Sequence, residues 1–229
     1  MEATLPPSLP PGRIIESYGC SARLVWMSDG KLPDADAWWR RLYAQRARTG
    51  LYPVLLEYCE DWYEPTWPPR VPVDVAAYLR DLWEPRSWPT FPHWPGLAVP
   101  AATGLDPGAC AAEVATGVVR EDWARCLALV EVERGTDAPA ALHWPPVDDA
   151  LTALLHSWED RFGAQVVALT HGGLFVSAAN PPKDLHEAHV LAGEHYLACP
   201  DVFHNSFDDW ENTYPRELMT RREWYFWWD

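Results

Sequence analysis

Three acidic residues in the last third of the chain have the chemistry that acid–base catalysis requires. Glu194 lies within an expected helix, Asp201 follows the end of that helix, and Asp229 comes directly after a run of aromatic residues. If these carboxyl groups meet in one cavity, burial and mutual repulsion raise the pKa of one of them, which can then act as an acid or base. The alternative is a structural role, for which Asp160-Arg161 offers a partner. Glu194, Asp201 and Asp229 are therefore the candidate catalytic residues.

The same region is rich in side chains that can bind metal ions. Eight of them fall within nineteen positions, namely His186, Glu187, His189, Glu194, His195, Cys199, Asp201 and His204. No H-E-x-x-H motif occurs among them, and on one helix His189 and Glu194 point in different directions. We predict no metal site and no cofactor, and assign these residues to helix caps and loop hydrogen bonds. A metal at this cluster is the open alternative.

Aromatic residues suggest a surface for a protein partner. The chain has 15 tryptophans and 23 prolines, and Trp-Pro steps interrupt residues 61–100. Tryptophan is a typical anchor of protein interfaces, although rings in such a segment can equally cover the core. The candidate partner-binding residues are Trp62, Trp67, Trp88 and Trp94.

The charge balance limits the class of partner. The chain has 18 basic and 33 acidic residues, a formal net charge of -15 that repels nucleic acid and anionic membranes. A strongly acidic surface suits solubility or attraction of a basic protein. The dense basic patch, which either contacts an acidic group or forms a solvated helix face, consists of Arg40, Arg41, Arg46 and Arg48.

Cysteine spacing and the N-terminal sequence predict a cytoplasmic protein. The five cysteines are widely spaced without a C-x-x-C pair, which predicts reduced, mostly buried thiols: Cys20, Cys59, Cys110, Cys126 and Cys199. The N-terminus lacks the pattern of a signal peptide, and no apolar run reaches transmembrane length. The scarcity of lysine and isoleucine suggests a GC-rich bacterial genome.

Apolar periodicity predicts both helices and strands. Strands are expected at residues 24–27, 52–58 and 126–132, and helices at 34–48 and 73–83. Small residues and glycines at 101–117 predict a linker or an exposed loop. The last third predicts a helix from Val147 to Phe162, a hairpin at 166–177, and a helix that begins after Asp184 and ends before Pro200.

These elements predict an α+β fold with a mixed sheet and helices packed mainly on one face. Five consecutive aromatic residues, 224–228, are too apolar for a solvated tail and suggest a strand central in the sheet, covered on both faces. We expect a proline-rich segment (1–19), an N-terminal α/β sub-module with a Trp-Pro-rich wrap (20–134) and a C-terminal helix-hairpin-helix-strand module (135–229).

Several motifs resemble a known family. They are Ser157-Trp158-Glu159-Asp160-Arg161-Phe162-Gly163-Ala164, Ala192-Gly193-Glu194-His195-Tyr196, Cys199-Pro200-Asp201 and Trp224-Tyr225-Phe226-Trp227-Trp228-Asp229. Over roughly residues 147–229 they are similar to the bacterial domain of unknown function 4253. Residues 26–30 and 49–53 are similar to its longer actinobacterial members, whereas 205–222 is more acidic and aromatic than that pattern. The family has no settled activity, so the resemblance implies no catalytic residues.

Three functional hypotheses follow. The first is a protein-binding module, of the immunity or adaptor kind, that uses an acidic, tryptophan-rich surface to bind a basic protein. The second is an enzyme or small-ligand binder with a carboxylate in a tryptophan-lined pocket, suited to sugars or other ring-shaped ligands. The third is a purely structural or oligomer-forming domain.

Overall fold

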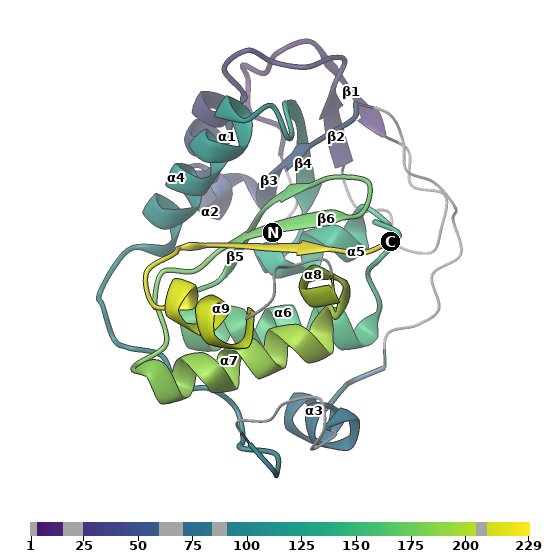
Figure 1. The fold of residues 1–229 in the computed structure, drawn as a ribbon. Helices are drawn as coiled ribbons and strands as arrows, with labels where there is room; N and C mark the ends of the chain where they lie inside the picture. The colour runs from purple at the N-terminus through teal and green to yellow at the C-terminus, as the bar shows by residue number, and fades with distance from the viewer. Residues whose placement is uncertain (1–3, 16–24, 60–70, 84–90, 205–209) are drawn as a thin grey trace.

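Seven apolar segments pair into one mixed sheet in the order β1-β2-β4-β3-β5-β6-β7 (Figure 1). The computed structural model describes residues 4–15, 25–59, 71–83, 91–204 and 210–229. Within them the strands are β1 (Gly12–Ile15), β2 (Val25–Ser28), β3 (Leu51–Leu56), β4 (Cys126–Glu131), β5 (Gln165–Leu169), β6 (Gly173–Ser177) and β7 (Glu223–Trp227). Neighbours are antiparallel except β3 and β5, which are parallel. The α+β prediction is confirmed.

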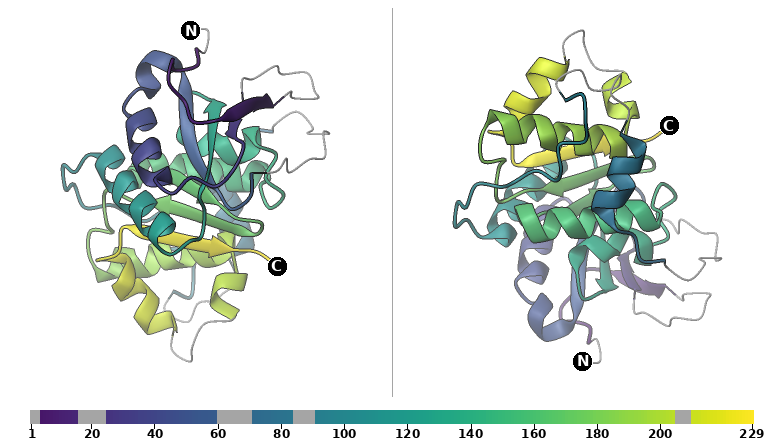
Figure 2. Two further views of the ribbon diagram at one scale, coloured as in Figure 1. Left: turned by 90° about the horizontal axis from the view of Figure 1, so that it is seen from above. Right: turned by 90° about the horizontal axis from the view of Figure 1, so that it is seen from below.

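Helices cover both faces of this sheet. They are α1 (Ala35–Tyr43), α2 (Arg46–Thr49), α3 (Val75–Leu82), α4 (Pro107–Arg120), α5 (Ala138–Ala141), α6 (Asp149–Phe162), α7 (Leu185–Ala198), α8 (Asp201–His204) and α9 (Trp210–Leu218), with a 3-10 turn, η1 (Gly135–Asp137). α1 and α4 lie over one face, and α6 and α7 lie over the other (Figure 2). The structure thus divides the helices between the faces, whereas we expected them mainly on one.

β7, the aromatic C-terminal strand, lies at the edge of the sheet, so its predicted central position was wrong. Its side chains alternate between the two faces. Trp224 and Phe226 are buried against α6, where Phe226 stacks on Trp158 with ring centroids 5.3 Å apart. Tyr225 points to the opposite face and packs on Phe175 of β6. An edge strand with one neighbouring strand and helices on both faces can therefore bury side chains such as Trp224 and Phe226.

Residues 101–117 are not a linker, because most of them form α4. Asp106 caps this helix by accepting a hydrogen bond from Ala109 N at 2.7 Å, and Pro107 occupies the first turn. The small residues that suggested a loop instead allow close packing. A Cβ on Gly108 would lie 2.3 Å from the Tyr43 ring, so only glycine fits there without a shift.

Locally encoded elements agree with prediction. Asp148 caps α6 by accepting from Leu151 N at 2.7 Å, and Gly163 ends that helix with a φ of 62°. α7 begins with the expected cap, in which Asp184 accepts from Glu187 N, and ends before Pro200. β2 and β3 run parallel to each other, with β4 inserted between them. The β3–β5 pairing joins the two expected sub-modules in one sheet, and their boundary stays a prediction.

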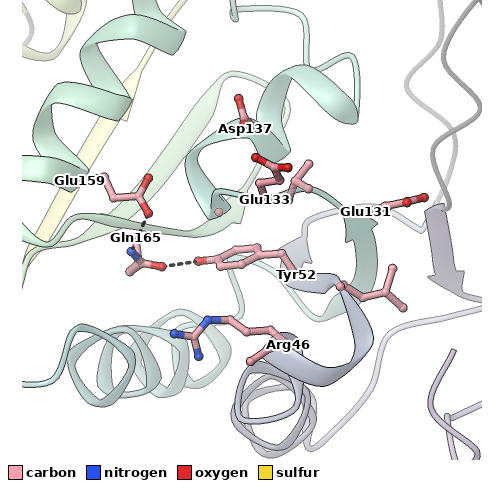
Figure 3. Close-up of a pocket in the computed structure, with 12 residues that line it drawn as sticks. Arg46, Tyr52, Glu131, Glu133, Asp137, Glu159 and Gln165 are labelled. Atoms are coloured by element: carbon pink, nitrogen blue, oxygen red, sulfur yellow. Dashed lines mark hydrogen bonds between the residues drawn. The ribbon is translucent and has the colours of Figure 1, made fainter. Parts of the chain in front are cut away.

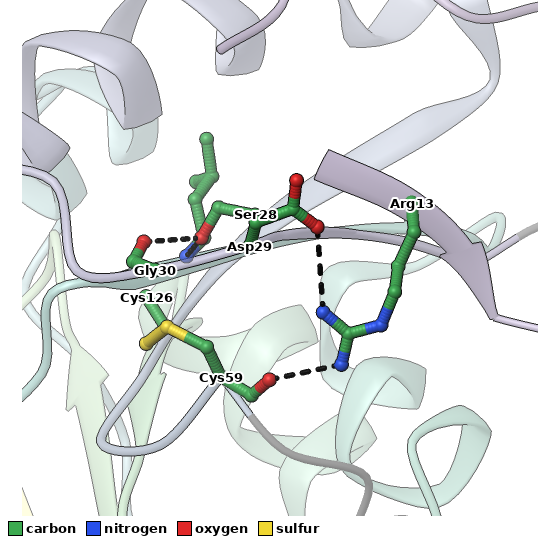
Figure 4. The surroundings of a disulfide bond; sticks show 7 residues. Arg13, Ser28, Asp29, Gly30, Cys59 and Cys126 are labelled. Carbon is green, nitrogen blue, oxygen red and sulfur yellow. Dashed lines mark hydrogen bonds and ion pairs between the residues drawn. A yellow bond between two sulfur atoms is a disulfide. The ribbon is translucent and has the colours of Figure 1, made fainter. Parts of the chain in front are cut away.

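Cys59 and Cys126 form a disulfide, which contradicts the prediction that both are reduced (Figure 4). Leu56, the last residue of β3, pairs with Cys126 at the start of β4, so the chain just beyond β3 lies close to Cys126. Arg13 of β1 donates to Cys59 O at 3.0 Å. Cys110 and Cys199 are free and buried as expected, and Cys20 lies outside the described residues. Since disulfides are typical of oxidising compartments, the cytoplasmic location stays a prediction.

Candidate functional site

An open pocket of about 820 Å³ lies where β3 and β5 begin and β4 ends (Figure 3). Its position follows from the topology, because β4 runs antiparallel to β3 and brings its last residue beside the first residue of β3. The loop after β4, η1 and one side of α6 complete the wall. The lining residues are Arg46, Ala47, Gly50, Leu51, Tyr52, Glu131, Val132, Glu133, Gly135, Asp137, Glu159 and Gln165.

Carboxylates dominate the charge of this pocket. Glu131 ends β4, Glu133 follows in the loop, Asp137 ends η1 and Glu159 projects from α6, whereas Arg46 is the one basic residue among the described residues that line the pocket. Glu133 is exposed and the other three carboxylates are partly buried. These acidic groups come from separate elements and face a common space. We name this feature the acidic pocket.

The floor of the acidic pocket is uncharged. Tyr52 donates a hydrogen bond from its hydroxyl to Val166 O at 2.7 Å, and burial raises the pKa of this tyrosine well above its ordinary value. Gln165 accepts from Tyr43 Oη at 3.2 Å and donates to Ala164 O at 2.8 Å. A Cβ on Gly135 would lie 2.3 Å from the Tyr52 ring. The tyrosine and the glutamine thus form a neutral, well-fixed base beneath the acids.

Two of the acids have partners that fix their position. Glu159 accepts from Arg134 Nε at 2.8 Å and from the Thr136 hydroxyl. Asp137 Oδ1 lies 3.0 Å from His156 Nε2. These contacts orient carboxylates before any ligand arrives, which lowers the entropy that binding costs.

Arg46 does not cross the pocket to neutralise the acids. Its Cζ lies 3.8 Å from the Tyr43 ring centroid, and its Nη1 donates to Tyr43 O at 3.1 Å. The other arginines of the predicted basic patch also have intramolecular partners: Arg40 bonds Thr116, Arg41 bonds Ser8 and Arg48 bonds Gln45. Even with Arg134 counted against Glu159, the four carboxylates outnumber the arginines at the described part of the pocket, so its chemistry suits a cation.

Glu194 is enclosed in the core rather than in a pocket. Its carboxylate accepts from Arg161 Nη1 at 3.0 Å and Nη2 at 2.6 Å, from Trp158 Nε1 at 2.9 Å and from Ala98 N at 2.7 Å. The residue has no exposed surface. These four bonds correspond to the structural alternative, in which the carboxylate satisfies buried donors.

The other two candidate carboxylates lie near the surface. Asp229 is exposed, and its backbone N donates to Asp201 Oδ2 at 3.4 Å. The structure thus brings Asp201 and Asp229 together, while the four bonds of Glu194 involve neither of them. None of the three lines the acidic pocket.

His195, beside Glu194, is buried in an aromatic cage. Its ring centroid lies 4.7 to 4.9 Å from those of Trp158, Trp224 and Phe226, and its Nδ1 lies 2.9 Å from Tyr214 Oη. Burial first, and the charge of Arg161 second, lower the pKa of His195 well below its ordinary value. Across the described part of the chain, no group of three or more His, Cys, Asp or Glu side chains is arranged to hold a metal ion.

Of the candidate partner-binding tryptophans, Trp94 is described and the other three are not. Trp94 is partly buried and meets Trp83 edge to face, with ring centroids 5.4 Å apart. Trp62, Trp67 and Trp88 lie outside the described residues. The role of all four in partner binding stays a prediction.

Sequence reasoning missed the acidic pocket. The available signal was the alternation Glu131-Val132-Glu133 directly after an apolar strand and before Gly135. Glu159 and Tyr52 carried no comparable signal, because only the β3–β5 pairing brings their elements together. No helix among the described residues has the length and apolarity needed to cross a membrane.

Comparison with known proteins finds one family model that matches part of this chain. No curated protein and no solved structure matches it. Residues 126–229 match the model of the family described as Domain of unknown function (DUF4253), a range that includes four acids of the pocket and Gln165 but not Arg46 or Tyr52. The C-terminal part of this chain, residues 126–229, is therefore similar to the DUF4253 family.

Proposed function

We propose that this chain is a binding protein for a basic protein partner, and that a lysine or arginine side chain of the partner enters the acidic pocket. The observation that carries the proposal is the convergence of four carboxylates from separate elements on one open space of about 820 Å³. An immunity-type or adaptor protein that sequesters a basic partner needs such a surface.

Electrostatics supports this at two ranges. The formal net charge of -15 attracts a basic protein from a distance and accelerates encounter. At close range, Glu131 and Glu133 line the same pocket as Glu159 and Asp137, which are already oriented by Arg134 and His156. A cationic side chain entering the pocket therefore meets carboxylates in place rather than mobile ones.

The competing hypotheses receive less support. An enzyme that uses Glu194 would need this carboxylate to reach a substrate, yet Arg161, Trp158 and Ala98 occupy it. A purely structural domain has no need of an open pocket with an excess of one charge. The acidic pocket favours binding over both.

The experiment is a binding titration with a labelled peptide of alternating arginine and glycine, followed by fluorescence anisotropy. The double variant Glu131→Gln/Glu133→Gln is expected to weaken binding about 30-fold, from roughly 1 kcal/mol for each lost carboxylate. The control Asp81→Asn/Glu113→Gln removes the same charge from exposed positions outside the pocket. Equal weakening by both double variants would mean that net charge alone attracts the peptide, and would refute the proposal that the peptide binds in the acidic pocket.

A second titration separates a protein partner from a free cation. Spermidine presents ammonium groups and free arginine methyl ester presents a guanidinium group, in both cases without a polypeptide. If either binds as tightly as the peptide, the ligand is a small cation and the protein-partner proposal fails. If the peptide alone binds, the proposal stands.

A further inference from the structure

We propose a second binding site, for the ring of a neutral sugar, on the exposed face of Trp123. This residue follows α4 and lies beside β6 and β7, away from the acidic pocket, and no residue lines both sites. The inference is independent of the basic partner proposed above.

The backbone holds Trp123 in a defined position. Asp122 has a φ of 62°, in the left-handed region that is unusual for a residue other than glycine. Asp122 N donates to Val119 O at 3.2 Å and Trp123 N donates to Val118 O at 3.0 Å, the paired bonds of a Schellman motif. Arg125 Nε lies 2.8 Å from Asp122 Oδ1. The end of α4 therefore presents the tryptophan on a rigid support.

The indole is supported from one side and open on another. Its centroid lies 5.9 Å from the ring of Phe175 and 6.0 Å from that of Tyr225. Even so, 48% of Trp123 remains exposed. The exposed part of this ring is available to a ligand, whereas Trp158 and Trp224 are buried in the core.

A pocket of about 410 Å³ adjoins this ring, and its charges compensate one another. Arg120 pairs with Glu121 at 3.1 Å, Arg221 pairs at 3.2 Å with Glu217, which lies outside the lining, and Arg222 donates to Ala179 O at 3.1 Å. The lining residues are Gly117, Val118, Arg120, Glu121, Trp123, Phe175, Arg221, Arg222 and Glu223. Because both signs of charge are present and largely paired, the pocket favours a neutral ligand with many hydroxyl groups over an ion.

A sugar ring fits this combination of groups. The electron-rich face of an indole attracts the slightly positive C–H groups on one side of a sugar. Guanidinium and carboxylate groups at the margin, Arg222 and Glu223, can donate to and accept from its hydroxyls. The volume lies near the lower end of the range for ligand pockets, which indicates one or two sugar units rather than a long chain.

The test is saturation-transfer NMR of the full chain with four neutral disaccharides: maltose, cellobiose, lactose and diacetylchitobiose. At least one is expected to bind saturably, and Trp123→Ala is expected to weaken that binding about tenfold, from the worth of an aromatic contact. Trp123→Phe, which keeps a ring, should retain part of the affinity even if the alanine variant folds poorly. Trp38→Ala is the matched control, because Trp38 is a partly buried tryptophan outside this pocket.

Three results would overturn the inference. The first is that none of the four sugars binds. The second is that a sugar binds but with equal affinity to Trp123→Ala and the unaltered chain. The third is that glucuronic acid or glucosamine binds through Trp123 while the neutral sugars do not, which would show that the site recognises charge.

Discussion

The disulfide between Cys59 and Cys126 closes a large loop of chain, because the two cysteines are separated by 67 positions in sequence. Such a link restricts the unfolded chain much more than the folded one. In the chain-entropy treatment, the cost of closing a loop of this size is about 15 cal/mol/K, or about 4 kcal/mol at 25 °C. We therefore expect that loss of the disulfide lowers the free energy of unfolding by about 4 kcal/mol and the Tm by roughly 8 to 16 °C.

The variant Cys59→Ser removes the link with little disturbance of packing. Cys59 is only partly buried, whereas Cys126 has no exposed surface and would leave a buried hydroxyl if it were changed to serine. Thermal and urea unfolding of the variant and the unaltered chain, each with and without a phosphine reductant, give four curves. The reductant should destabilise the unaltered chain as much as the substitution does, and should leave the variant unchanged.

The free cysteines provide the internal control. Cys110 and Cys199 are buried thiols without a disulfide, so a reductant has no bond to break at either. If the reductant does not change the free energy of unfolding of the unaltered chain, and that of Cys59→Ser lies within about 1 kcal/mol of it, the disulfide contributes no stability and the reasoning fails. Peptide mapping without reduction checks directly that the Cys59–Cys126 peptide is present.

Three further predictions concern individual side chains. Glu194→Ala should cost about 3 to 5 kcal/mol in urea unfolding because it leaves the partly buried Arg161 without its carboxylate partner, whereas Asp201→Ala should stay within about 0.5 kcal/mol. Similar values for the two variants would argue against a structural role of Glu194. Burial lowers the pKa of His195 in the folded chain, so as the pH falls the unfolded chain takes up the proton first. The free energy of unfolding should therefore be at its full value above about pH 7 and should fall by about 1.4 kcal/mol by pH 5.5. His195→Leu should abolish this loss if the histidine causes it. Gly135→Ala should cost about 1 to 3 kcal/mol because its Cβ would clash with Tyr52, while Gly30→Ala, where nothing lies within 4 Å, should be nearly neutral; a tolerated Gly135→Ala would show that the Tyr52 floor can move.

Sequence patterns identified the helices whose start, end and apolar face depend on residues close together in the sequence. The caps at Asp148 and Asp184, the glycine stop at Gly163 and the apolar face of α6 act within a few residues, so they could be recognised without the fold. The α+β class followed from the same patterns. The sequence also located Glu194, and its structural alternative identified Arg161 as the partner.

Tertiary structure decided which elements are neighbours, and every incorrect expectation depends on that. We predicted a central position for the aromatic strand because its apolar composition indicates burial. Burial is equally possible at an edge that helices cover. Residues 101–117 resembled a loop because small side chains have no apolar period, yet their size lets α4 pack closely. The Cys59–Cys126 link and the acidic pocket join residues from 67 to more than 100 positions apart. Such contacts arise from strand order, which depends on packing across the whole sheet and leaves no signature in short stretches of sequence.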